Sequence, residues 1–81
     1  MTLQEKIDKL PLSIIYNGRK YKLFIGMTAG IIRLTYRCHQ PIFQEMIIEV
    51  YDMVKEKSLS STLEDVIDRA LTIIENKEWE I

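Results

Sequence analysis

The single cysteine and the single histidine of the chain are neighbours in the sequence, at Cys38 and His39. A thiol beside an imidazole is the pair from which cysteine enzymes build their nucleophile. Adjacent residues of a strand point to opposite faces, so these two side chains would not meet. One cysteine and one histidine also fall short of the four ligands of a structural zinc site. We therefore expect a protein that is not an enzyme, with no catalytic residue, metal or cofactor.

A row of acidic residues is the second candidate, in the segment from Pro41 to Lys57, which we interpret as a helix. Four carboxylates recur at helical spacing and would share one face, where they can bind a divalent ion or a basic partner. Metal sites of this kind need inward-facing carboxylates, whereas these lie opposite the apolar residues, so a solvated face is the simpler interpretation. We define a possible second binding surface from this row, one apolar residue among the acids and a C-terminal tryptophan. It comprises Glu45, Ile48, Glu49, Asp52, Glu56 and Trp79.

The basic residues gather in a different part of the chain. Residues 17–40 contain five bases and no acid, whereas residues 41–81 contain ten acids and four bases. The overall charge of −1 therefore conceals a strongly dipolar sequence, and such asymmetry indicates an interaction surface. Strand alternation places most of these bases on one sheet face, which we predict to bind a partner. This basic sheet face comprises Lys20, Lys22, Phe24, Arg33, Thr35 and Arg37.

Two kinds of partner suit that face. Arginine and lysine can contact phosphates while Phe24 stacks on a base, which would make the chain a nucleic-acid-binding protein. The uncovered face of an antiparallel sheet is also ordinarily polar, so the same residues can be a solvated surface. The acidic second half of the chain opposes simple coating of DNA, because phosphate affinity depends on local positive charge. We expect a protein partner first, with nucleic acid as the alternative.

The elements that position these residues begin with a helix and a hairpin. Thr2 followed by Glu5 is a capping box, which predicts a short helix from about Leu3 to Lys9. Asn17-Gly18 favours a two-residue type I′ turn between the strands Leu12–Tyr16 and Arg19–Ile25. This turn predicts a register in which Tyr16 faces Arg19 and the apolar residues of both strands share one face.

The rest of the chain is predicted as one more strand and two helices. A third strand runs from Ile31 to Cys38, rich in β-branched and aromatic residues. The helix from Pro41 to Lys57 follows, with apolar residues over about half of its circumference. Ser61 with Glu64 forms a second capping box, which predicts a last helix that continues to about Asn76. Trp79 then lies on a tail.

The predicted fold is a single α+β domain over residues 1–81, in the order α-β-β-β-α-α. A three-stranded antiparallel meander would carry the last two helices on its apolar face. The wide apolar surface of the Pro41–Lys57 helix, with Ile48 outside it, predicts a homodimer.

The N-terminus lacks an apolar signal segment and the lone cysteine excludes an internal disulfide, so we expect a cytoplasmic protein without membrane contact. The predicted function is a small non-enzymatic interaction protein, an adaptor, regulator or inhibitor that docks a charged surface on a macromolecular partner. The length suits an inhibitor encoded by a virus or a mobile element.

Overall fold

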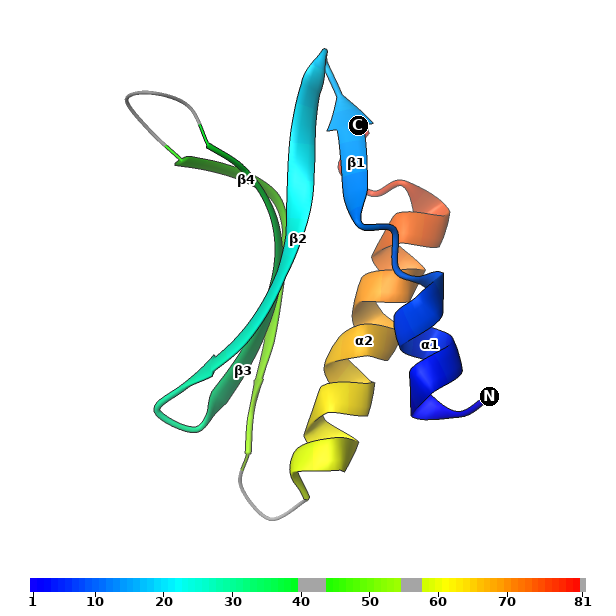
Figure 1. Ribbon diagram of the computed structural model, residues 1–81, viewed down its shortest axis with the longest axis vertical. Coiled ribbons are helices and arrows are strands. Elements are labelled where there is room, and N and C mark those ends of the chain that lie inside the picture. The colour runs from blue at the N-terminus through cyan, green and yellow to red at the C-terminus, as the bar shows by residue number, and fades with distance from the viewer. Residues whose placement is uncertain (40–43, 55–57, 81) are drawn as a thin grey trace.

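The computed structural model describes residues 1–39, 44–54 and 58–80. It has two layers, a curled antiparallel sheet and a helical layer on one face of that sheet (Figure 1). Helix α2 packs against strands β3 and β4, and helix α1 lies beside α2. In chain order the elements are α1 (Leu3–Lys9), β1 (Ser13–Tyr16), β2 (Arg19–Thr28), β3 (Ile31–His39), β4 (Gln44–Met53) and α2 (Leu59–Asn76).

The predicted α+β class is confirmed, but the predicted element order is wrong in one place. The sheet has four strands in the order β1-β2-β3-β4, each antiparallel to its neighbour, where we expected three. The order of elements is therefore α-β-β-β-β-α.

The first hairpin forms as its sequence predicts. Asn17 and Gly18 both have positive φ, at 51° and 75°, as a type I′ turn requires. Tyr16 pairs with Arg19, and the register continues to Ser13 opposite Lys22. The turn chemistry and the apolar alternation agree on this register, which is why a local signal was sufficient here.

The predicted helix from Pro41 to Lys57 is the main error. Residues Gln44–Met53 form strand β4, and positions 41–43 and 55–57 lie outside the described residues. A β-bulge explains the misleading pattern: Tyr36 pairs with Ile48 but the next residue, Arg37, pairs with Met46. The extra residue shifts the inside–outside alternation by one, so that apolar side chains appear at spacings that resemble a broad helical surface.

Both helices begin at capping residues. The Thr2 hydroxyl accepts a hydrogen bond from the Glu5 amide at 3.2 Å, so the predicted α1 is confirmed. The cap of helix α2 lies three residues before the predicted one, because Ser58 and not Ser61 caps it: the Ser58 hydroxyl accepts from the amide of Ser61 at 3.1 Å. Its end at Asn76 is as predicted, and Lys77 takes the left-handed conformation, with a φ of 49°, that closes many helices.

The core lies between the sheet and α2. Leu34 and Tyr36 of β3 are fully buried against Val66 and Ile67 of α2. The Tyr36 hydroxyl donates to the carbonyl oxygen of Pro11 at 2.7 Å, so this buried polar group is satisfied. Burial raises the pKa of Tyr36 to about 12, because the charged phenolate cannot be solvated there.

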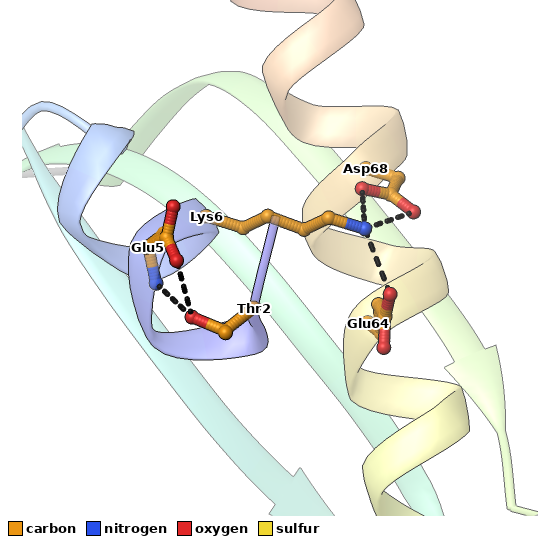
Figure 2. A network of polar contacts seen from close by, with 5 residues as sticks. All are labelled: Thr2, Glu5, Lys6, Glu64 and Asp68. Carbon is orange, nitrogen blue, oxygen red and sulfur yellow. Dashed lines mark hydrogen bonds and ion pairs between the residues drawn. The ribbon is translucent and has the colours of Figure 1, made fainter.

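Polar contacts join α1 to α2 and α2 to β4. The Lys6 ammonium of α1 donates to Glu64 of α2 at 2.7 Å and lies 3.0 Å from the Asp68 carboxylate, as Figure 2 shows. Hydrogen bonds to Glu64 and then to Asp68 raise the pKa of Lys6. On the other side of α2, the Arg69 guanidinium donates to the Tyr51 carbonyl of β4 at 2.7 Å.

Candidate binding surface

Strand alternation gives the sheet a second face, which no described element covers. Its residues lie in rows across strands β2, β3 and β4, one residue from each strand. The rows are Lys22–Arg37–Met46, Phe24–Thr35–Glu49 and Gly26–Arg33–Tyr51. We call this surface, together with the flanking Ile15, Lys20 and Met53, the concave face.

The ends of the strands curl away from the helical layer, so the sheet is curved on this side (Figure 1). A hollow of about 540 Å³ lies over it, lined by residues of β2, β3 and β4. Thr35 lies in the middle strand of this face and is only 3% exposed, whereas Arg33 beside it on β3 is exposed. The surface is therefore a depression with a closed middle and accessible walls.

Gly26 leaves part of this hollow empty. Its φ lies outside the positive region, and a Cβ added to it would meet nothing within 4 Å. The fold itself therefore does not require glycine at this position. A glycine inside a strand often marks a place where a ligand or another backbone approaches closely. A side chain at position 26 would therefore project into space that the described residues leave open.

Arg37 lines the hollow and packs on the ring of Phe24. Its guanidinium carbon lies 4.1 Å from the centroid of the Phe24 ring, a cation–π contact, and Phe24 meets His39 edge-on at 6.2 Å. The Arg37 Nε is buried without a hydrogen-bond partner among the described residues.

Positive charge predominates on the concave face. Glu49 is its one described acid, and the carboxylate lies 3.7 Å from Arg33 Nε. Both side chains are exposed, so this ion pair contributes little stability. Four bases against one acid leave the surface suited to an acidic partner. The bases are Lys20, Lys22, Arg33 and Arg37.

Exposed apolar side chains accompany those bases. Each of them lies outside the core although its size would favour burial. They come from β1, β2 and β4, and the described residues offer them no cover. They are Ile15, Phe24, Met46, Tyr51 and Met53. The sequence analysis missed the contribution of β4 because it placed Met46, Tyr51 and Met53 on a helix. The β-branched residues of this segment were the available signal for a strand.

The structure brings the predicted basic sheet face together. Lys22, Phe24 and Arg37 are neighbours across β2 and β3, and Arg33 and Thr35 continue the same face along β3. Lys20 lies on that face opposite Ile15. Whether these residues bind a partner stays a prediction.

The structure separates the predicted second surface. Ile48 is 4% exposed and belongs to the core, because β4 turns it toward α2. Glu49 faces the hollow, and Glu45 forms an ion pair with Arg19 of β2 instead. The acidic row therefore does not form one face, since it was based on helical spacing that β4 does not have.

The other members of that predicted surface lie elsewhere. Asp52 pairs with Ile32 on the side of the sheet that faces α2. Trp79 packs half-buried against the core, and its indole nitrogen has no partner among the described residues. Glu56 lies outside the described residues.

Cys38 and His39 point in different directions. Cys38 is a buried thiol in the core, 7% exposed, whereas His39 is exposed and its ring lies nearly perpendicular to the Phe24 ring. Across residues 1–39, 44–54 and 58–80 there is no cluster of three or more histidine, cysteine or acidic side chains that could hold a metal ion.

The fold and this surface define a two-layer α+β protein with one covered and one open sheet face. No protein family model matches the chain, and neither a curated protein nor a solved structure matches it. Neither of the two helices that the structure describes combines the length and apolar character needed to cross a membrane.

Proposed function

We propose that this chain is a small non-enzymatic interaction protein that binds a macromolecular partner through its concave face. The observation that carries the proposal is the hollow over Gly26, flanked by exposed apolar side chains and by four bases against one acid. Apolar anchors that fill a pocket, surrounded by charged groups, are the usual composition of a protein–protein hot spot. An adaptor, regulator or inhibitor needs no more than such a surface.

The chemistry of the concave face favours an acidic protein over a nucleic acid. Met46 and Met53 are exposed there, and flexible methionines suit apolar protein surfaces. The aromatic rings of Phe24 and Tyr51, which could stack on bases, keep nucleic acid as the alternative.

The proposed setting is the cytoplasm. The sequence contains one cysteine, the buried Cys38, and a chain without internal disulfides is usual in a reducing compartment. A small inhibitor encoded by a virus or mobile element is one kind of protein that would act in this way.

The first test separates the two kinds of partner. Labelled single- and double-stranded DNA and RNA are titrated with the protein at two salt concentrations, beside the double variant Arg33→Ala/Arg37→Ala and the control Lys9→Ala in α1. If the partner is a protein, we expect no salt-sensitive binding of DNA or RNA that depends on these two arginines. Salt-sensitive binding that the double variant loses and the control keeps would replace the proposal with the nucleic-acid alternative.

The second test uses tagged protein to capture partners from an extract of the source cells. We expect a partner that the wild type and Lys9→Ala retain and that Arg33→Ala/Arg37→Ala releases. Equal retention by all three proteins would show that the concave face is not the binding surface.

A further inference from the structure

Strand β1 covers only half of β2. Residues Ser13–Tyr16 pair with Arg19–Lys22, and the Leu23 amide donates to the Leu12 carbonyl at 3.0 Å. The chain enters β1 from α1 beside the middle of β2, as Figure 1 shows. Beyond Leu23, none of the described residues pairs with this edge of β2, which continues to Thr28. We call residues 24–28 the open edge.

The backbone of the open edge points outward. In an antiparallel pair, alternate residues direct both N–H and C=O toward the same neighbouring strand. Because the Leu23 amide points to Leu12, the amides and carbonyls of Ile25 and Met27 point to the same side, where no described strand follows. These groups are available to another strand.

The side chains of the open edge also favour pairing. The segment Phe24-Ile25-Gly26-Met27-Thr28 carries no charge and no proline. Ile25 is 42% and Met27 is 58% exposed, although both lie on the side of the sheet that carries the core. Proteins ordinarily protect such an edge with charge, proline or a very short strand, and this segment has none of these.

The opposite edge of the sheet is different. Strand β4 pairs only with β3 and carries Glu45, Glu49 and Asp52 along its length. Two β4 strands side by side would bring like charges together, which is unfavourable. Acidic residues on an edge strand oppose self-association, so the two edges differ in what they can accept.

We infer that the open edge pairs antiparallel with the open edge of a second copy of this chain. The segment is neutral and can face itself across a twofold axis, which closes the assembly at two copies. Pairing of the open edge with β4 of another copy would be heterologous, and such contacts continue into open filaments. The product is a continuous eight-stranded sheet, made of two sheets of four strands.

This dimer does not depend on the proposed function, because its hydrogen bonds use the backbone of Ile25 and Met27, whose side chains lie on the core side of the sheet and not on the concave face. The twofold axis of an antiparallel pair is perpendicular to the sheet, so both concave faces would lie on the same side. The dimer would therefore present two binding surfaces in one direction. A contact of five residues per chain is small, and we expect a weak dimer whose population rises with concentration.

Sedimentation velocity of the purified full chain, from micromolar to millimolar concentration, tests this inference. The wild type should shift toward twice its 9.6 kDa mass as concentration rises. The double variant Ile25→Lys/Met27→Lys should raise the dissociation constant about tenfold or more, because it places like charges opposite each other at the twofold contact. The matched control Met53→Lys, an exposed methionine on the concave face, should dimerise as the wild type does.

Amide hydrogen exchange supplies a second readout on the unaltered protein. The amides of Ile25 and Met27 should become protected as concentration rises, while the exposed amides of the Asn17-Gly18 turn should not. A wild type that stays monomeric at millimolar concentration overturns the inference. A dimer that survives in Ile25→Lys/Met27→Lys, or that leaves both amides unprotected, overturns it as well.

Discussion

The two faces of the sheet are built from alternate residues of the same strands, yet they obey different rules. Strand β3 lies between β2 and β4. Its residues Leu34 and Tyr36 are fully buried under α2, whereas Arg33 on the same strand is exposed on the concave face. Burial of apolar surface accounts for the covered face. It does not account for exposed Met46, Tyr51 and Met53 on the open one. The covered face therefore stabilises the fold, while the open face retains apolar side chains that folding leaves exposed.

The largest expected effect is on stability, and it separates the two faces. Leu34→Ala should lower the free energy of unfolding by about 3–5 kcal/mol, because it opens a cavity in a fully buried site. Tyr51→Ala on the concave face should change it by less than about 0.5 kcal/mol, because that side chain is already exposed. Urea unfolding followed by circular dichroism measures both variants.

Similar losses in the two variants would contradict the division between a stabilising face and a free face. The exposed apolar residues would then contribute to folding after all, and their exposure would not indicate a partner.

A smaller effect is expected from the one buried hydroxyl that links the sheet to the segment after α1. Tyr36→Phe removes the hydrogen bond to the Pro11 carbonyl and should cost about 1–2 kcal/mol. The wild type should also lose stability as the pH rises from about 10, where the unfolded phenol ionises, to about 12, where the folded one does. The sign follows because the unfolded chain binds fewer protons in this range, so high pH favours unfolding.

Unfolding measured across this pH range, with an ultraviolet titration of the phenols, tests that expectation. Burial also raises the pKa of Tyr21, and hydrogen bonds to Glu64 and Asp68 raise the pKa of Lys6, so both groups add to the loss of stability in the wild type. The free energy of unfolding of Tyr36→Phe should therefore still fall as the pH rises, but less steeply than that of the wild type. If the free energy of unfolding falls equally steeply with pH in the variant and the wild type, Tyr36 is not the main group that causes the loss of stability at high pH.

The smallest effect is expected at the junction of the two helices. Lys6→Met removes the ammonium that contacts Glu64 and Asp68, and the urea midpoint should fall less than in Tyr36→Phe, since both carboxylates remain partly exposed. Added salt should reduce the difference from the wild type. The control Lys9→Met, on the same helix, should show no such salt dependence. A difference that does not change with salt would indicate a loss of packing instead of an ion pair.

Local signals in the sequence predicted the first half of the fold. The Thr2 cap and the Asn17-Gly18 turn each act within a few residues, so they required no knowledge of distant contacts. Strand β4 was not predictable from periodicity, because its bulge opposite Tyr36 and Arg37 arises only in the pairing with β3. The predicted binding surface was therefore incomplete. Charge and strand alternation identified the residues that β2 and β3 contribute to the concave face, but not those that β4 contributes.

The fate of Ile48 illustrates the same limit. Outside the apolar surface of a helix it indicated a subunit contact, but as a strand residue it belongs to the core of its own chain. The homodimer inferred here therefore rests on a different feature, the open edge of β2. That edge becomes visible only when the short β1 is placed beside the long β2.

The most direct test of the binding surface is the variant Gly26→Val, assayed for unfolding and for affinity toward the protein captured by the wild type. Valine is compatible with an ordinary strand conformation, meets no neighbour at Cβ, and favours strands. The free energy of unfolding should therefore stay unchanged or rise by up to about 1 kcal/mol, while isothermal titration shows affinity reduced about tenfold or more as the hollow is filled. Unchanged affinity in a stably folded Gly26→Val protein would contradict the assignment of the concave face as the binding surface.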